Sequence, residues 1–151
     1  MKASVYRELD ALLRKDVIIS TNTSTLCVLT LAKVIPNRSA KFIGFHLMNP
    51  VPMMKLVEIV RSELTDEDTV HTSVELAHRL GKTPIVCKDS PGFINNRILS
   101  QYVNSGIVAL EKEMASKEDI DKTMTLGFGF PIGPLALADM IGLDVICSAS
   151  Q

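Results

Sequence analysis

The pattern of apolar residues changes at the segment Asp89-Ser90-Pro91-Gly92. Before it, stretches with helical spacing alternate with short runs rich in β-branched residues, whereas everything from Phe93 onward has helical spacing. Helices that alternate with strands are typical of a wound sheet with helices packed against it. The sequence therefore predicts an α/β layer, then an all-helical part, with a domain boundary near residue 90.

Composition and charge limit the classes of protein to which this chain can belong. With 151 residues, of which 46% are hydrophobic, the chain is long enough for one ordinary domain or for parts of two. Sixteen basic residues and seventeen acidic residues leave a formal charge of −1, which favours neither nucleic acid nor an anionic membrane surface. We therefore expect the partner to be a small molecule or another copy of the chain.

Three cysteines, Cys27, Cys87 and Cys147, lie far apart in the sequence. Their spacing matches neither a zinc site nor a disulfide framework, so no bound metal is expected. No apolar run approaches the roughly 20 residues that span a bilayer, and the first residues contain no signal-peptide core. These features predict a soluble protein of a reducing compartment, the cytoplasm.

Local patterns predict the positions of the elements. Strands are expected at residues 16–20, 41–48, 55–61 and 83–88, and helices at the beginning of the chain, at about 26–34, 65–81 and 93–112, after Ser116 and from Pro134 onward. Thr65 followed by Asp68 resembles a capping box, and Gly81 would end that helix. The polar run Thr21-Asn22-Thr23-Ser24-Thr25 follows the first strand. Because ligands bind at the carboxyl ends of strands in an open α/β sheet, this run is a candidate site.

His46 and Glu58 are the first candidates for chemistry. Pro50 and Pro52 lie between them and predict a turn centred on Pro52, from which each residue is six positions away. An antiparallel pair would then place the two side chains opposite each other, with their Cβ atoms about 5 Å apart. A carboxylate at that distance orients an imidazole and raises its basicity, as a general base for a hydroxyl proton requires. The alternative is a core histidine beside an edge carboxylate.

Longer segments carry a family resemblance. They are Ser24-Thr25-Leu26, His46-Leu47-Met48-Asn49-Pro50-Val51-Pro52-Met53-Met54-Lys55-Leu56-Val57-Glu58 and Lys88-Asp89-Ser90-Pro91-Gly92-Phe93-Ile94-Asn95-Asn96-Arg97, followed by 115–121 and 127–139. In this order they closely resemble the 3-hydroxyacyl-CoA dehydrogenase family over nearly the whole chain. The resemblance implies an NAD-dependent oxidoreductase that interconverts L-3-hydroxyacyl-CoA and 3-oxoacyl-CoA in fatty acid metabolism of the butanoate type.

The same resemblance implies a fold and a catalytic pair. Residues 1–90 would be part of a Rossmann-like NAD-binding domain, and residues 91–151 part of an all-α domain for dimerisation and substrate binding. His46 would be the base that takes the 3-hydroxyl proton, with Glu58 as its carboxylate partner. Ser24 would contact both substrate and cofactor, although capping of the following helix is an alternative for it.

Three further residues receive roles from the resemblance alone. Asn96 would help to position the acyl-CoA carbonyl, and Asn49 and Lys2 would contact NAD. An ordinary first-turn polar residue is the alternative for Asn96, and a turn former before proline is the alternative for Asn49.

The chain departs from the family pattern at the glycine-rich turn that binds the NAD pyrophosphate. No G-x-G-x-x-G sequence follows a strand, and Gly127 to Gly133 is interpreted as an interhelical turn. Compared with the family, the chain is expected to be truncated at both ends. A non-catalytic fragment or oligomerisation module is therefore an alternative, and a related hydroxy acid or sugar acid is an alternative substrate. The wide apolar arc of the 93–112 helix predicts burial on more than one side and a homo-oligomer.

Overall fold

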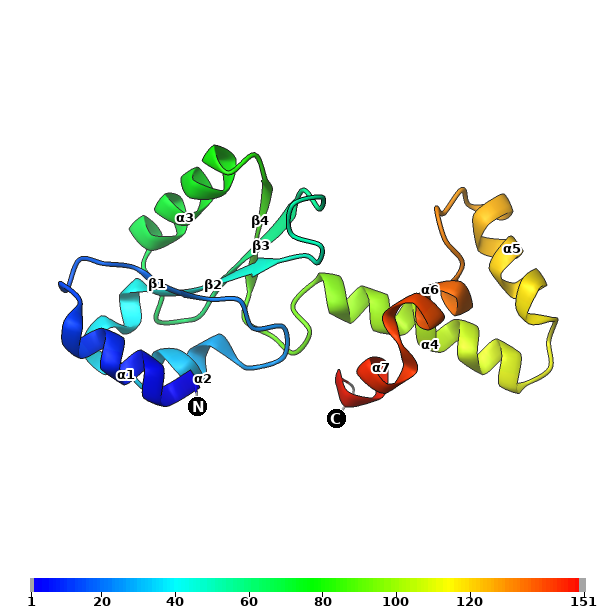
Figure 1. Ribbon diagram of the computed structural model, residues 1–151, viewed down its shortest axis with the longest axis horizontal. Helices are drawn as coiled ribbons and strands as arrows, with labels where there is room; N and C mark the ends of the chain where they lie inside the picture. The colour runs from blue at the N-terminus through cyan, green and yellow to red at the C-terminus, as the bar shows by residue number, and fades with distance from the viewer. Residues whose placement is uncertain (1, 150–151) are drawn as a thin grey trace. The chain divides into compact units, whose positions relative to one another are not determined.

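The computed structural model describes residues 2–149 (Figure 1). They form two compact units, one ending at Ile94 and the other beginning at Asn95, and each is described by itself. The first contains α1 (Lys2–Leu12), β1 (Ile19–Thr21), α2 (Val28–Ala32), the 3-10 helix η1 (Pro36–Lys41), β2 (Phe42–Leu47), β3 (Leu56–Arg61), α3 (Glu67–Arg79) and β4 (Thr83–Lys88). The second contains α4 (Asn95–Glu111), α5 (Lys117–Gly127), α6 (Pro134–Ile141) and α7 (Leu143–Ala149). The predicted α/β layer followed by helices is confirmed.

The first unit is built around a four-stranded sheet with the strand order β1-β2-β3-β4. β1 is parallel to β2 and β3 is parallel to β4, while β2 and β3 are antiparallel. Helices α1 and α2 cover one face of the sheet, and α3 covers the other (Figure 1). Because side chains alternate across a strand, Phe42, Gly44 and His46 of β2 share the face on which α1 and α2 pack.

Each face of the sheet has its own hydrophobic core. The core beneath α1 and α2 is formed by Tyr6, Ile19, Val28, Leu31, Ala32, Ile35, Phe42, Val60, Cys87 and Phe93. The core beneath α3 is formed by Ile43, Phe45, Val57, Ile59, Val70 and Ala77. At Gly44 an added Cβ would lie 2.7 Å from Val60 Cβ and 3.2 Å from Val28 Cγ2, so glycine allows α2 to pack closely on the sheet.

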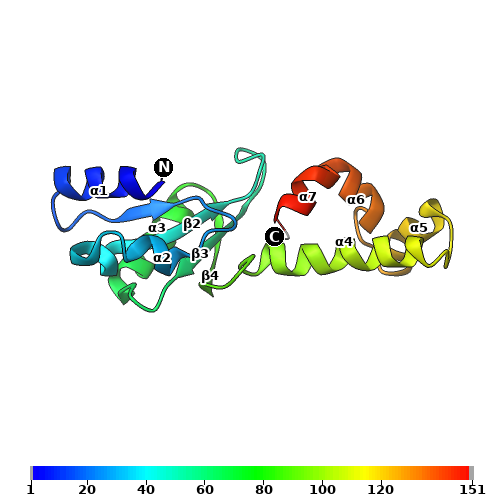
Figure 2. The same ribbon diagram turned by 90° about the horizontal axis from the view of Figure 1, so that it is seen from below.

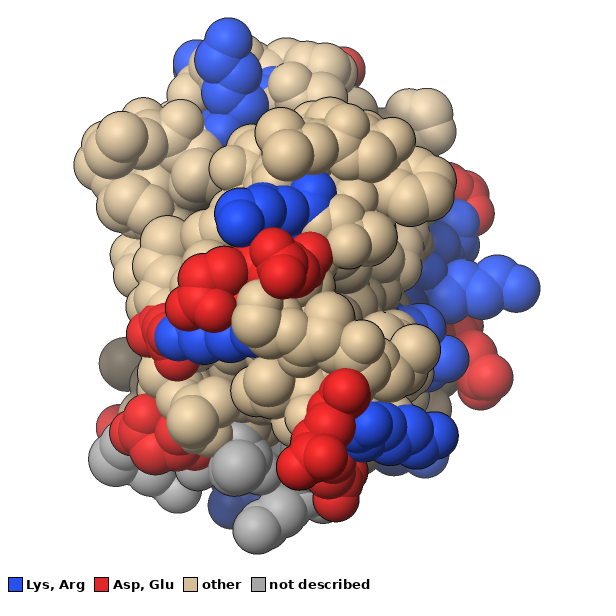
Figure 3. Space-filling view, turned by 90° about the vertical axis from the view of Figure 1, so that its right-hand side faces the viewer, with Lys and Arg blue, Asp and Glu red and all other residues tan. Residues whose placement is uncertain are grey.

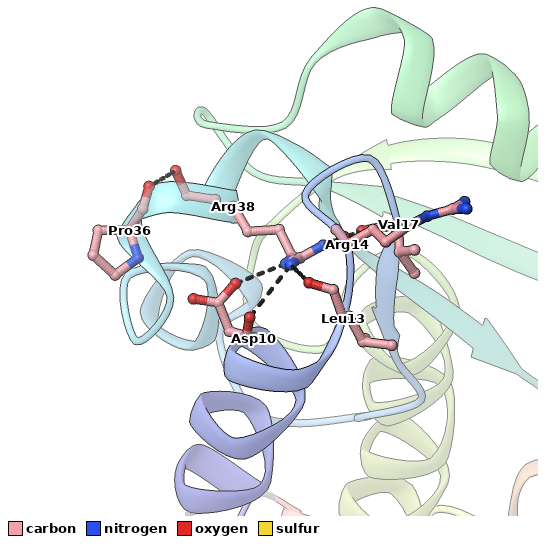
Figure 4. Close-up of polar contacts among 7 residues, drawn as sticks. Asp10, Leu13, Arg14, Val17, Pro36 and Arg38 are labelled. Atoms are coloured by element: carbon pink, nitrogen blue, oxygen red, sulfur yellow. Dashed lines mark hydrogen bonds and ion pairs between the residues drawn. The ribbon is translucent and has the colours of Figure 1, made fainter.

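A buried arginine holds the end of α1 in place (Figure 4). Arg38 in η1 forms an ion pair with Asp10 at 2.7 Å, and its guanidinium donates to the backbone carbonyls of Leu13 at 2.8 Å and Val17 at 3.0 Å. It also donates to the carbonyl of Arg14. The last carbonyls of a helix have no partner within the helix, and Arg38 donates to one of them, that of Asp10, at 3.4 Å, as well as to the carbonyls of the segment that follows α1.

The predicted strand at 16–20 is wrong at its beginning. The Val17 N–H donates to the Arg14 carbonyl at 3.2 Å and closes a turn, so the strand begins only at Ile19 and ends at Thr21. The helix predicted at 26–34 is also shorter, with bounds Val28–Ala32.

The predicted capping box of α3 is wrong by one residue. Asp66 is the N-cap, and its Oδ1 accepts a hydrogen bond from the Thr69 N–H at 2.7 Å. The Thr65 hydroxyl instead donates to the carbonyl of Phe42 at 2.9 Å, across to β2. The predicted end of this helix holds, because Gly81 has a φ of 71°, which favours glycine.

Polar side chains cap the helices of the second unit. Ser116 accepts from the Asp119 N–H at 3.2 Å and caps α5 as predicted. The segment from Gly127 to Gly133 joins α5 to α6, which confirms its interpretation as an interhelical turn. Asp121 of α5 caps α6, because its carboxylate accepts from the N–H groups of Leu135 at 2.8 Å and Ala136 at 2.9 Å.

Two predictions for the second unit are wrong. The helix that begins at Pro134 does not continue to the end of the chain, because Gly142 with a φ of 96° separates α6 from α7. The long helix α4 is not buried on several sides within this chain: its buried residues are Val103 and Gly106, whereas Ile98 is 65% exposed. α6 packs beside α4 at Gly106 (Figure 2), where an added Cβ would lie 2.7 Å from Pro134.

The surface combines charges of both signs. On the face drawn in Figure 3, acidic and basic side chains lie among uncharged ones, without a large area of one sign. Across residues 2–149, no helix has the length and apolar character needed to cross a membrane.

Candidate active site

His46 and Glu58 form a buried pair on neighbouring antiparallel strands. The register places His46 of β2 directly opposite Glu58 of β3, as the turn centred on Pro52 predicted. His46 Nδ1 lies 2.7 Å from Glu58 Oε2, and the two residues are only 4% and 1% exposed. A carboxylate and an imidazole removed from water interact more strongly than they would at the surface, so this contact fixes the orientation of the ring.

The other nitrogen of the imidazole faces Ser24. Ser24 Oγ lies 3.0 Å from His46 Nε2. Because an ionised carboxylate only accepts hydrogen bonds, the network assigns the ring proton to Nδ1 and leaves a lone pair on Nε2 for the serine hydroxyl. The arrangement can accept a proton at Nε2 while Glu58 stabilises the resulting imidazolium.

Ser24 lies in the polar loop that follows β1. Helix α2 begins only at Val28, so Ser24 does not cap it. The N–H of Leu29 in the first turn instead donates to the Asp89 carboxylate at 2.7 Å. In the same loop, Asn22 Oδ1 accepts from the Leu47 N–H at 2.8 Å, which joins the loop to the residue after His46.

The second oxygen of Glu58 is also held. Glu58 Oε1 accepts a hydrogen bond from the backbone N–H of Ile94 at 3.0 Å. The ring of Phe93 lies edge-on to the ring of His46, with their centroids 5.4 Å apart and an angle of 64° between the ring planes. Neither contact was predicted from the sequence, because both depend on the path of the backbone after β4, which no local sequence pattern specifies.

The segment between the two strands is fixed by a lysine. Lys82 Nζ donates to the carbonyls of Val51 at 2.5 Å and Met54 at 2.8 Å. Both carbonyls belong to the connection between β2 and β3, which also carries Asn49. The connection that separates His46 from Glu58 in sequence is therefore tied to the residue that precedes β4.

A buried cysteine lies on β4 near the pair. Burial, together with the negative charges of Glu58 and Asp89, raises the pKa of the Cys87 thiol to about 11. A thiol with so high a pKa stays protonated at neutral pH and is a poor nucleophile. Cys87 is therefore part of the packing around the site and not a reactive group.

The structure brings Ser24, His46 and Glu58 together within the first unit. Lys2 is exposed in α1, and Asn49 is exposed in the connection after β2. Asn96 belongs to the first turn of α4 in the second unit, where its Oδ1 lies 3.4 Å from Asn95 Nδ2.

Comparison with known proteins decides the family. Residues 1–90 match the model of the 3-hydroxyacyl-CoA dehydrogenase NAD binding domain, and residues 92–151 match that of the 3-hydroxyacyl-CoA dehydrogenase C-terminal domain. The chain belongs to the 3-hydroxyacyl-CoA dehydrogenase family. The two matches follow one another along the chain in the same order as the α/β layer and the helices.

Individual members of the 3-hydroxyacyl-CoA dehydrogenase family are similar over nearly all of this chain. A 3-hydroxybutyryl-CoA dehydrogenase from Clostridioides difficile is 45% identical over 97% of the chain, and a mitochondrial hydroxyacyl-coenzyme A dehydrogenase from Sus scrofa is 43% identical over 95%. The crystal structure of (S)-3-hydroxybutyryl-CoA dehydrogenase from Ralstonia eutropha has a TM-score of 0.94 at 44% identity over 98% of the chain. These matches cover 52%, 46% and 52% of the other proteins, so the chain spans about half their length.

Proposed function

We propose that this chain carries the proton-transfer residues of an NAD-dependent L-3-hydroxyacyl-CoA dehydrogenase. The observation that carries the proposal is the buried pair of His46 and Glu58, with Ser24 on the free imidazole nitrogen. The names of the bacterial relatives support a short-chain substrate such as a 3-hydroxybutyryl-CoA.

In the oxidation direction, His46 Nε2 accepts the proton of the substrate 3-hydroxyl. The Glu58 carboxylate at Nδ1 stabilises the imidazolium that forms, and in the reverse direction the same proton returns to the 3-oxo oxygen. Ser24 Oγ lies 3.0 Å from Nε2, so its hydroxyl lies where it would orient the substrate hydroxyl. NAD, when bound, accepts the hydride that leaves C3 of the substrate.

The residues present fit the reacting end of NAD. The loop with Asn22 and Ser24 follows the carboxyl end of β1, the side of an open α/β sheet where dinucleotides bind. We propose that Ser24, Asn49 and Lys2 contact the cofactor and that Asn96 contacts the acyl-CoA. The 151 residues contain no G-x-G-x-x-G sequence after a strand, so they do not supply a glycine-rich turn for the pyrophosphate.

Substitution of the base tests this proposal. The enzyme is a complete dehydrogenase of the family whose corresponding segment is replaced by this chain. His46→Gln should lower kcat by about 10²–10⁴-fold, the usual contribution of a positioned general base, and should change KM much less. His78→Gln, on the exposed surface of α3, is the matched control and should leave kcat unchanged. A near-normal kcat in the His46 variant would refute the assignment.

We also propose that residues 1–90 and 91–151 are parts of two domains and that the second part associates with another copy of the chain. The meeting of the two family matches between residues 90 and 92 supports the boundary. Large apolar side chains on the helices support self-association, since Leu126 is 82% exposed, Phe128 72% and Met140 69%.

A further inference from the structure

The turn that leads from β4 to α4 has an unusual backbone. Gly92 has a φ of 73° and Phe93 has a φ of 48°. Glycine adopts such angles readily, but a bulky aromatic residue in the left-handed region is an outlier. Conformations of this kind persist only where the surroundings impose them, and they gather at functional sites.

Several hydrogen bonds impose this conformation. The Phe93 N–H donates to the carbonyl of Ser90 at 2.9 Å, and the Asp89 N–H donates to the carbonyl of Arg61 at 3.0 Å. The Asp89 carboxylate accepts from the Leu29 N–H, and so connects the turn to the segment that carries Ser24. Phe93 is only 3% exposed and belongs to the core beneath α1 and α2, so its ring is held by packing as well.

The turn contacts both members of the pair. The N–H of Ile94 reaches Glu58 Oε1 and thereby orients the carboxylate so that Oε2 faces the imidazole. The ring of Phe93 covers the imidazole of His46 edge-on. With Glu58 at Nδ1 and Ser24 at Nε2, the imidazole is restrained from three directions.

We infer that Phe93 is a positioning residue for His46 and Glu58: its left-handed backbone directs the Ile94 N–H at the carboxylate, and its ring excludes water from the imidazole. Its importance for turnover rests on the proposed function, whereas its effect on the pair does not. The inference can therefore be tested on the 151-residue chain without cofactor or substrate.

The test is nuclear magnetic resonance of the His46 Nδ1 proton. In the native chain this buried proton should exchange slowly with water, because Glu58 holds it and Phe93 covers it. Phe93→Leu keeps an apolar side chain but removes the ring, and should speed exchange by roughly tenfold, the factor that accompanies loss of one edge-to-face aromatic contact. Phe42→Leu is the matched control. Phe42 is fully buried in the same core but packs against Tyr6, with ring centroids 5.0 Å apart, so exchange at His46 should not change.

A second variant tests the role of the backbone without changing the ring of Phe93. Gly92→Ala places a Cβ at a φ of 73° and should displace the Ile94 N–H while Phe93 stays intact. It should also speed exchange of the His46 proton. If Phe93→Leu does not fold, the result for Gly92→Ala alone tests the inference. Unchanged exchange in the folded variants would overturn the inference, yet would leave the kcat of the His46→Gln enzyme as expected. Normal kcat in His46→Gln with fast exchange in Phe93→Leu would reject only the proposed function.

Discussion

Single buried polar side chains hold the first unit together at several points. Glu58 uses both carboxylate oxygens, one for His46 and one for the Ile94 N–H. Arg38 binds Asp10 and the carbonyls of the segment that follows α1. Removing one partner of such a group leaves a buried charge or polar atom without compensation, which costs more than the contact itself contributes. Substitutions at these residues should therefore affect folding as well as function.

The cysteines give a prediction at this scale. Cys27 is exposed, whereas Cys87 is buried and has a pKa of about 11. At pH 8 a thiol-alkylating reagent should label Cys27 in the native chain and leave Cys87 unlabelled, because the thiolate is the reactive form. Peptide mass mapping after brief labelling distinguishes the two, and denatured chain is the control in which both react. Equal native labelling of both residues would contradict the burial of Cys87.

The pair of His46 and Glu58 could be predicted from the sequence, but its surroundings could not. The two prolines limited the connection, and the symmetric spacing about Pro52 then fixed the register. The N–H of Ile94 and the left-handed φ of Phe93 depend on the path of the backbone after β4. For Ser24 the sequence allows either ligand contact or a helix cap, and the structure removes the second role because α2 begins at Val28 with Cys27 as its N-cap.

At the scale of elements, the helices end or begin where a side chain from elsewhere satisfies their backbone. Asp121 caps α6 from α5, and Arg38 accompanies the end of α1 from η1. Propensity and local spacing do not contain these long-range partners, so the predicted bounds differ from those observed by a few residues. Helix α3 shows the same effect, because the Phe42 carbonyl takes the Thr65 hydroxyl and leaves the cap to Asp66.

The cap of α3 gives a pH-dependent prediction. Burial alone would raise the pKa of Asp66, but the hydrogen bonds from Thr69 and the nearby Lys41 outweigh it, so the pKa lies below its ordinary value of 3.8. Asp66→Ala should lower the free energy of unfolding at pH 7 by about 0.5–2 kcal/mol, the usual contribution of an N-cap. Because the folded-state pKa is lowered, this contribution is present above the ordinary pKa and is lost as the pH falls through the lowered one.

Urea unfolding at several pH values measures this contribution. The difference between the native chain and Asp66→Ala should be constant near neutrality and should shrink in acid. Asp68→Ala is the matched control, since Asp68 is exposed in the same first turn but is not the N-cap. A larger loss from Asp68→Ala than from Asp66→Ala would reverse the assignment.

At the scale of the whole molecule, the change of periodicity at residue 90 was the most informative sequence feature. It predicted strands only before it, and within residues 95–149 the regular elements are all helices. Burial of α4 was overpredicted, because a wide apolar arc indicates that a surface will be covered but not whether the same chain covers it. Ile98 is 65% exposed on that helix.

Self-association should follow from the exposed apolar side chains of the helices. Light scattering at micromolar concentration should give a mass above the 16.5 kDa of one chain. Leu126→Glu should return the mass to that of a monomer, because a charge opposes burial in an apolar interface. Leu12→Glu is the matched control, since Leu12 of α1 is equally exposed at 82% and should leave the assembly intact. A monodisperse monomer of the native chain would contradict the proposal.

The central claim is that His46 and Glu58 act as one unit in proton transfer, and a double-mutant cycle tests it most directly. In a complete dehydrogenase that carries this segment, kcat is measured for His46→Gln, Glu58→Gln and the double variant. Each single change should lower kcat, and the double variant should lose far less than the product of the two single losses, because residues that act as a unit are not additive. Losses that simply multiply would show that the two side chains act independently and would contradict the claim.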